Sequence, residues 1–290
     1  MFNFLERNLP KIIIAPTTLA MIVCMYGFIL WTGVLSLTKS RMMPQWEFVG
    51  LEQYIRLFQN PRWHVALDNL LIFIVLFIAI SLIIGLLLAI FLDQRIRAEG
   101  AIRTIYLYPM AISFIVTGTA WKWILNPGLG IEKMFRDMGF ADFEFRWLVE
   151  QEMAIYTIVI AAVWQSSGFV MAMFLAGLRG VDDNLVKAAK IDGASTIKSY
   201  WYVILPIMRP VFFSAIVILT HIAIKSFDLV QALTGGGPGY ASDLPANFMY
   251  TFAFNRAQMG LGAASAIIML FGVLAVLIPY LYSELRERPA

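Results

Sequence analysis

The sequence NLLIFIVLFIAISLIIGLLLAIFL, residues Asn69–Leu92, contains no charged side chain. It is longer than the roughly 20 residues that a helix needs to cross the hydrocarbon core of a bilayer. Over all 290 residues, 60% are hydrophobic, only 14% are charged, and the mean hydropathy is +0.75. A soluble domain carries about a quarter charged residues, and one buried core could not absorb this apolar excess. The composition therefore predicts an integral membrane protein.

Further apolar segments flank this run. We expect an all-α fold with six transmembrane helices in a single domain of residues 1–290, at approximately 12–37, 69–92, 104–125, 153–178, 207–230 and 257–283. The fifth segment is interrupted by Lys225 and Asp228, but apolar sequence resumes at Leu229. The first exceeds the roughly 7–15-residue apolar region of a signal peptide, so we expect it to be retained.

Basic residues favour one side of the predicted membrane. Twelve lie in residues 1–11, 93–103, 179–209 and beyond 283, whereas the other three connections hold eight, together with ten acids. Loops rich in Lys and Arg stay in the cytoplasm. Both termini and the connection between the fourth and fifth spans are therefore predicted to be cytoplasmic.

That connection, residues 179–206, is called the elbow here, and it includes LVKAAKIDGASTIKSYWYVILP at Leu185–Pro206. Joining two helices takes only about two to eight residues, and a long ordered loop is more often functional. Two interpretations remain open. The elbow is either a re-entrant surface loop or a docking site for a cytoplasmic partner, and its length favours docking.

The elbow sequence predicts two short helices. Asp182 or Asp183 can cap the first helix by accepting hydrogen bonds from free N–H groups of its first turn. Gly193 stands where that helix should end, because glycine enters the left-handed conformation without steric cost. Ser195 can cap the second helix, and Pro206 suits the first turn of the fifth span. One face of the first helix carries mostly small residues: Leu185, Ala188, Ala189 and Asp192.

Several chemistries find no support in the sequence. There is no G-x-x-x-x-G-K-[ST] motif, so a P-loop must lie on another polypeptide if ATP drives this protein. The single cysteine, Cys24, cannot form an intrachain disulfide, and the two histidines, His64 and His221, suggest neither a metal site nor a hydrolytic site. The net charge of +3 is too small to suggest nucleic acid. We expect no catalytic residue, metal or cofactor in this chain.

Two motifs in the elbow carry a family resemblance. K-A-A-x-x-D-G-A at Lys187–Ala194, followed by V-I-L-P at Val203–Pro206, resembles the E-A-A-x-x-x-G loop of ABC-importer permeases. The resemblance implies a coupling helix that fits a groove on the ATP-hydrolysing subunit. Lys187 stands where the family usually has a glutamate. This reversal of charge would be matched by an acidic residue on the ATPase. The implied coupling residues are Lys187, Ala188, Ala189, Asp192, Gly193, Ala194, Leu205 and Pro206.

The resemblance extends along most of the chain. Val49–Asn60, Arg103–Pro127 and Phe227–Phe254 resemble the maltose-type branch of carbohydrate-uptake permeases, and Arg103–Pro127 with Gly168–Asp183 is most similar to glucose/mannose importer permeases of Gram-negative bacteria. It implies a multi-pass permease subunit in a bacterial inner membrane. The implied partners are a sister permease, two copies of an ABC ATPase that bind the ATP, a periplasmic sugar-binding protein, a sugar and the lipid bilayer. An ion-coupled secondary transporter, a permease for another solute and an intramembrane enzyme are the alternatives. The sequence shows no matching pair of broken helices, which would favour a secondary transporter. It also shows no catalytic set, which would favour an enzyme.

Polar residues inside the predicted spans are candidates for the substrate pathway. His221, Lys225 and Asp228 recur on one face of the fifth span, and intramembrane charges usually face a cavity or each other. Lys225 and Asp228 could simply pair, whereas His221 could contact a sugar hydroxyl. In the fourth span the sequence places an aromatic ring beside three polar side chains, at Trp164, Gln165, Ser166 and Ser167. These four could bind a sugar or could serve only helix packing.

Two further motifs can be interpreted as structural or as functional. Trp121 and Trp123 lie near the end of the third span, where an aromatic belt at the membrane surface is expected. The run Gly235–Pro238 falls in a loop on the side opposite to the elbow. It is either a flexible turn or, as the resemblance implies, a surface that faces the periplasmic binding protein.

Overall fold

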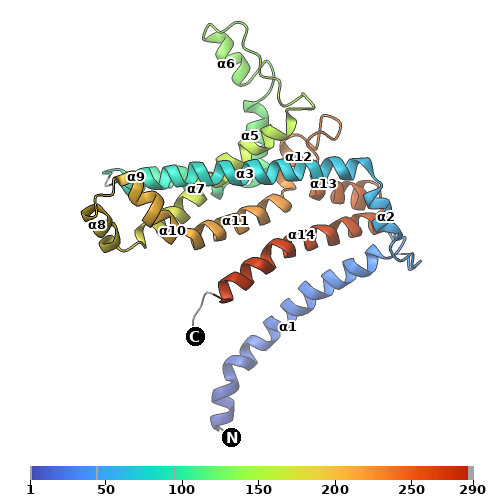
Figure 1. The fold of residues 1–290 in the computed structure, drawn as a ribbon. Coiled ribbons are helices and arrows are strands. Elements are labelled where there is room, and N and C mark those ends of the chain that lie inside the picture. Colours follow the sequence, from blue (N-terminus) through green and yellow to red (C-terminus); the bar gives the residue numbers. More distant parts are fainter. Residues whose placement is uncertain (1, 44, 95, 287–290) are drawn as a thin grey trace. The chain divides into compact units, whose positions relative to one another are not determined.

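The computed structural model describes residues 2–43, 45–94 and 96–286, and this part of the chain is almost entirely helical (Figure 1). Four of its helices are long and apolar enough to cross a membrane: α1 (Phe2–Ser36), α3 (Pro61–Asp93), α7 (Ala154–Arg179) and α14 (Met259–Arg286). Two bent helix pairs raise the number of candidate spans to six if each pair counts as one. The expected all-α membrane fold is confirmed.

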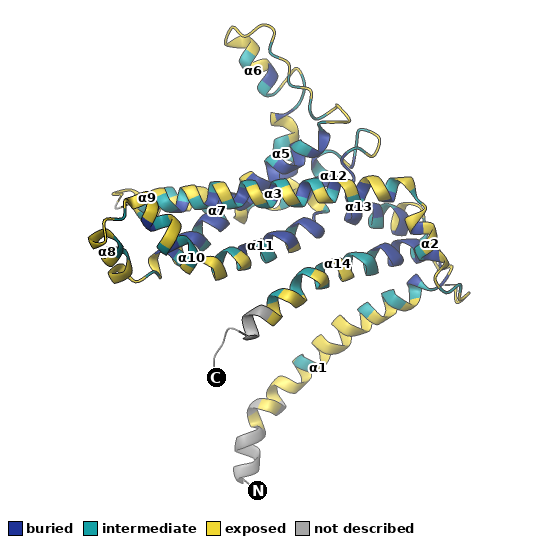
Figure 2. Ribbon diagram, in the orientation of Figure 1, coloured by how far each residue is buried: buried dark blue, intermediate teal, exposed yellow. Residues whose placement is uncertain are grey.

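The chain forms two compact units, and the first combines Met1–Asn60 with Phe248–Leu270. The most apolar part of α1 buries none of its residues within the structure (Figure 2). Beyond α1 come the short helix α2 (Glu52–Phe58) and, before α14, a π-helical turn, η2 (Thr251–Asn255). Gly260 ties the start of α14 to the loop after α1, because its N–H donates to the Ser40 carbonyl at 3.0 Å.

The second unit combines Pro61–Asn247 with Phe271–Ala290 and is built around α7. In the most apolar stretch of α7, 72% of the residues are buried, and α7 is the darkest long helix in Figure 2. Glycines let neighbouring helices approach: a Cβ on Gly85 of α3 would lie 2.6 Å from Val170 of α7, and one on Gly168 would overlap the Tyr106 carbonyl. The close contacts of α7 therefore depend on small residues.

The predicted third span, 104–125, is not one straight helix. It consists of α4 (Glu99–Ala111) and α5 (Phe114–Ile124), which meet at 100°. Pro109 removes a backbone donor in the last turn of α4, Ile112 is extended, and Ser113 caps α5 by accepting the Val116 N–H at 3.3 Å. A proline followed by a capping serine explains the break.

The predicted fifth span, 207–230, is also divided. Its main helix, α11 (Arg209–Ile224), ends before Lys225, and α12 (Asp228–Leu233) follows after a short turn. The helical stretch 196–207 meets α11 at 65°. The two bent pairs are therefore α4 with α5 and residues 196–207 with α11, and α11 is separated from α12 by a further turn. Hydropathy does not reveal the bends, because both halves of each bent pair are apolar.

The remaining helices of the described residues are short. They are α6 (Ile131–Asp137), α8 (Asp183–Ile191), α9 (Thr196–Ser199), the π-helical turn η1 (Tyr200–Ile204), α10 (Leu205–Ile207) and α13 (Pro245–Tyr250). Four of them, α8, α9, η1 and α10, make up most of the elbow.

Candidate functional site

The first helix of the elbow, α8, begins with a side-chain cap. The Asp182 carboxylate accepts a hydrogen bond from the Asn184 N–H at 2.9 Å. Asp182, with an extended backbone, is therefore the N-cap, and Asp183 is the first helical residue and lies favourably in the positive first turn. Of the two candidates from the sequence, the structure selects Asp182.

The same helix ends at the glycine that the sequence indicates. Gly193 has a φ of +84°, and its N–H donates to the Lys190 carbonyl at 3.1 Å. The Ala194 N–H donates to the Ala189 carbonyl at 2.9 Å. These two bonds form a Schellman motif, which satisfies carbonyls at the helix end and needs a residue in the left-handed conformation. The predicted stop at Gly193 is confirmed.

The second half of the elbow begins as expected and ends differently. Ser195 caps α9 by accepting the Lys198 N–H at 3.4 Å. The chain then continues through η1 into α10, and Pro206 lies in the first turn of α10 rather than of the spanning helix. That helix, α11, begins at Arg209 with Pro210 in its first turn. The expectation for Pro206 is wrong because a second proline four residues later starts the span.

The elbow presents a largely exposed surface. No residue of α8 is buried, and α8 is mostly yellow in Figure 2. Lys187, Ala188, Asp192 and Gly193 are exposed, whereas Ala189, Ala194, Leu205 and Pro206 are half-buried. Large apolar side chains are exposed alongside them: Leu185, Ile191, Ile197, Trp201 and Tyr202. Several large apolar side chains exposed on one short segment are typical of an interaction surface.

The base of the elbow is attached to the helical core. Arg179, the last residue of α7, places its guanidinium 2.8 Å from Glu99 at the start of α4 and 3.8 Å from Asp93 at the end of α3. Val186 and Tyr200 of the elbow pack against the core cluster. The ends of α3 and α7 and the start of α4 therefore meet where the elbow begins.

The four candidate residues of the fourth span divide into two groups. Trp164 is 41% exposed and contacts Trp121 of α5 edge-on, with ring centroids 5.9 Å apart. Gln165, Ser166 and Ser167 are buried, and the Gln165 amide donates to the Ile112 carbonyl at 2.7 Å. Gln165 thus supports the break between α4 and α5. Trp121 is half-buried and packs against the core cluster, in addition to any contact with the membrane surface.

The three candidates of the fifth span do not share one helical face. His221 lies on α11, Lys225 follows the end of that helix, and Asp228 starts α12. All three are exposed, and within the described residues no ion pair joins Lys225 to Asp228. His221 lines an apolar groove of about 230 Å³ between α11 and α14. No hydrogen bond or ring contact that the structure describes connects these residues to Trp164 or Gln165.

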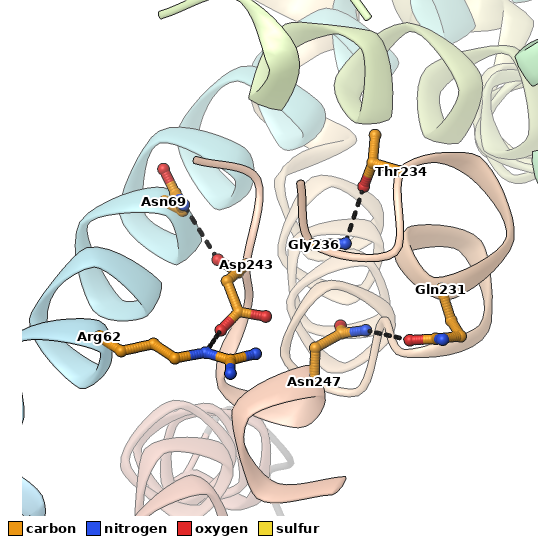
Figure 3. Close-up of polar contacts among 7 residues, drawn as sticks. All are labelled: Arg62, Asn69, Gln231, Thr234, Gly236, Asp243 and Asn247. Carbon is orange, nitrogen blue, oxygen red and sulfur yellow. Dashed lines mark hydrogen bonds and ion pairs between the residues drawn. The ribbon is translucent and has the colours of Figure 1, made fainter. Parts of the chain in front are cut away.

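The loop between α12 and α13, residues 234–244, is called the glycine loop, and it carries a site that the sequence does not reveal. Asp243 is fully buried, and its carboxylate accepts a hydrogen bond from the Arg62 Nε at 2.7 Å (Figure 3). The Asn69 amide donates to the Asp243 carbonyl at 3.0 Å. Both partners come from α3. Burial raises the pKa of the Asp243 carboxyl above its ordinary value, although the Arg62 guanidinium opposes that shift.

The glycine loop is also closed by its own bonds. The Thr234 hydroxyl accepts hydrogen bonds from the Gly236 N–H at 3.2 Å and from the Ser242 hydroxyl at 2.8 Å. Gly236 has a φ of +86°, so a residue with a side chain would be strained there. These hydrogen bonds and the left-handed glycine favour an ordered loop over a flexible turn.

Comparisons with known proteins agree with this architecture. The family model for binding-protein-dependent transport system inner membrane components matches residues 81–288. A probable ABC transporter permease protein of Pyrococcus horikoshii is 38% identical over 279 residues, which cover 95% of this chain and 96% of that protein. The xylose/arabinose import permease protein of Haloferax volcanii is 33% identical over 271 residues, 92% of this chain and 85% of that protein.

A solved structure extends the likeness to the fold. A chain of a bacterial ABC transporter involved in the import of the acidic polysaccharide alginate superimposes with a TM-score of 0.84, at 20% identity and with 99% of both chains covered. At that identity the likeness concerns the fold alone.

Proposed function

Because this chain belongs to the family of binding-protein-dependent transport system inner membrane components, we propose that it is the transmembrane permease subunit of an ATP-driven sugar importer. Proteins of this family are transport components rather than enzymes. A sugar as cargo is supported by the relative named for xylose/arabinose import and by the carbohydrate-uptake motifs of the sequence. Within the sugars, we propose glucose, mannose or a related hexose, on the similarity of Arg103–Pro127 and Gly168–Asp183 to glucose/mannose permeases.

The exposed elbow carries this proposal. Its first helix is closed by its own caps, buries no side chain, and exposes Ile191 and Ile197 at the turn. Leaving such side chains in water is unfavourable, by about 1.5–3 kcal/mol for each one relative to full burial. A groove on the ATP-hydrolysing subunit would cover them. The coupling residues Lys187–Ala189, Asp192–Ala194, Leu205 and Pro206 all lie on this surface or at its edge.

The attachment of the elbow suggests how motion would be transmitted. A displacement of α8 would act on Arg179, whose guanidinium contacts acids at the end of α3 and the start of α4. Those two helices and α7 pack closely through Gly85 and Gly168. ATP binding on two partner ATPases would therefore tilt the spans of the second unit together, and no nucleotide would bind to this chain.

The remaining partners follow from the family. A periplasmic binding protein would deliver the sugar, a sister permease would complete the pathway, and both termini of this chain would lie in the cytoplasm. For the sugar pathway we favour the exposed groups Trp164, His221, Lys225 and Asp228, because a buried group such as Gln165 is already committed to Ile112. An indole ring offers a face on which the C–H side of a sugar can stack.

Copurification tests the docking site. An affinity-tagged chain should bring down a P-loop ATPase, and Ile191→Asp should reduce the recovered ATPase by about tenfold or more, because a charge would be buried in the groove. Leu129→Asp is a matched control, since Leu129 is 75% exposed on a segment far from the elbow in sequence. Normal ATPase recovery with Ile191→Asp would refute docking through this surface.

The pathway residues need a separate test. Sugar binding to the cognate periplasmic protein identifies the cargo, and uptake titrations then compare His221→Ala with the parent. Loss of one net hydrogen bond to the sugar should raise the half-maximal concentration by about tenfold. Because Lys225 and Asp228 do not pair in this structure, the effects of Lys225→Met and Asp228→Leu should add rather than compensate. Recovery of uptake in the double variant would show that they pair during transport.

A further inference from the structure

A concave pocket of about 410 Å³ in the first unit has a strongly basic lining. It lies where the loop after α1, helix α2 and the start of α14 meet. Its charged and amide side chains are Lys39, Arg41, Arg56, Arg256, Gln53 and Gln258. None of its lining residues in the described chain is acidic. The pocket therefore suits an anion.

Among the described residues, most of the positive charge of the pocket has no ion-pair partner. Lys39 lies 4.0 Å from Glu47, and the Arg256 guanidinium lies over the Phe252 ring at 4.6 Å. Within the described residues no ion pair involves Arg41 or Arg56. Arginine is the residue that best matches the oxygens of phosphate or carboxylate.

The backbone around the pocket is firmly held. Gln53 is 2% exposed, and its amide donates to the Thr38 carbonyl at 3.1 Å. Gly260 approaches the same carbonyl so closely that a Cβ there would overlap it. Ala257 has a φ of +52°, a conformation that is costly for a residue with a side chain. The arginines therefore project from an ordered frame rather than from a loose loop.

An apolar groove of about 230 Å³ lies further along the same two spanning helices. It is lined by Phe28, Ile29 and Thr32 of α1 and by Ala266, Ile267 and Leu270 of α14. Leu261 borders the basic pocket, and Ala266 and Leu270 border the groove, so the groove lies about 7–14 Å further along α14 at 1.5 Å per residue. The charged and apolar cavities thus follow one another down α1 and α14.

Aromatic rings near the pocket place it at the edge of the bilayer. Trp31 and Trp46 meet edge-on with ring centroids 5.4 Å apart, and Trp46 and Phe48 are exposed. Indole rings concentrate at the level of lipid headgroups. We propose that the basic pocket binds the phosphate of an anionic phospholipid, one of whose acyl chains occupies the groove between α1 and α14. An acidic protein surface would match the charge but would leave the groove unexplained.

Native mass spectrometry tests this assignment. The full-length protein, purified with its partner subunits, is mixed with equal amounts of phosphatidylglycerol and phosphatidylcholine, and the retained lipid is identified. Phosphatidylglycerol should be retained in preference, and Arg56→Gln/Arg256→Gln should lower that preference by at least about tenfold. Lys133→Gln/Arg146→Gln, which removes two exposed basic side chains of the second unit, should leave it unchanged. If the double variant does not assemble, Arg41→Gln should give a smaller loss in the same direction.

Two further measurements separate the lipid from other anions. Ala266→Phe, which fills the groove and leaves every arginine in place, should weaken phosphatidylglycerol retention by severalfold. Displacement of the lipid by millimolar inorganic phosphate would overturn the proposal, because it would indicate a site for the free anion. The proposal is also wrong if Arg56→Gln/Arg256→Gln retains phosphatidylglycerol as the parent does and, in a separate assay in phosphatidylcholine nanodiscs, binds the periplasmic protein more weakly than the parent.

Discussion

The elbow and the glycine loop are both connections of the second unit, yet different kinds of contact hold them in place. In α8 the caps bond residues two to five positions apart, and no side chain of the helix is buried. In the glycine loop Asp243 is fully buried and bonds to residues 174 and 181 positions away. The difference separates a self-contained helix, whose surface is free for a partner, from a loop that is locked to a spanning helix.

Removing the buried carboxylate should have the largest effect on stability. Asp243→Ala takes the carboxylate away from Arg62, whose side chain is also largely buried, and breaking a buried ion pair costs about 3–5 kcal/mol. Thermal unfolding of the purified protein should show the loss. The double variant Arg62→Met/Asp243→Leu should be milder than Asp243→Ala, because no buried charge then remains at this point. Parent-like unfolding of Asp243→Ala would contradict the locking role of this pair.

Distorting the elbow should disturb coupling more than stability. Gly193→Val places a β-branched residue at a φ of +84°, with a local strain of about 1–3 kcal/mol. Sugar uptake, normalised to assembled protein, should fall by about tenfold or more. Gly128→Val is the matched control, because Gly128 has a φ of +80° and, like Gly193, has no atom within 4 Å of an added Cβ. Equal uptake by the two variants would mean that the elbow turn has no special role.

The raised pKa of Asp243 in the glycine loop predicts a pH dependence of the folding stability. The folded state holds the Asp243 proton more tightly than the unfolded state, so this group favours folding below its ordinary pKa of 3.8. That contribution is lost as the pH rises through the folded-state pKa, with a slope of at most about 1.4 kcal/mol per pH unit. Unfolding midpoints measured across this range should fall with pH in the parent and lose that slope in Asp243→Asn. An unchanged slope in the variant would assign it to other groups.

Removing the elbow cap should have the smallest effect. Asp182→Ala deletes the acceptor for the Asn184 N–H and should destabilise α8 by about 1 kcal/mol. Amide hydrogen exchange in α8 should then be about fivefold faster, while global unfolding stays nearly unchanged because no residue of α8 is fully buried. Asp183→Ala should accelerate exchange less, since Asp183 contributes only its charge near the helix start. A global loss of stability with Asp182→Ala would show that α8 is part of the core.

Much of the elbow could be predicted because its bonds are local. Asp182, Gly193 and Ser195 each act on backbone groups a few residues away, so the order of residue types nearly determines where α8 and α9 begin and end. Pro206 is the exception. A second proline, Pro210, competes for the start of the span, and sequence reasoning has no local rule that chooses between them.

The spatial arrangement of the candidate transport residues follows less directly from the sequence. A helical period places His221, Lys225 and Asp228 together only if the helix continues, and α11 ends at Ile224. Trp121 and Trp164 are 43 positions apart in the sequence and meet only because α5 packs beside α7. Their pairing depends on the 100° bend between α4 and α5, which hydropathy does not detect.

The sequence alone determined the membrane as solvent, the helical class, the family resemblance and the caps of the elbow, because each depends on composition or on residues close along the chain. Only the tertiary structure decided the two helix breaks, the buried pair of Arg62 and Asp243 and the basic pocket above the groove of α1 and α14. Bringing such distant groups together depends on the packing of whole helices. A lone aspartate in a glycine-rich loop looks the same in the sequence whether it faces water or an arginine on another helix.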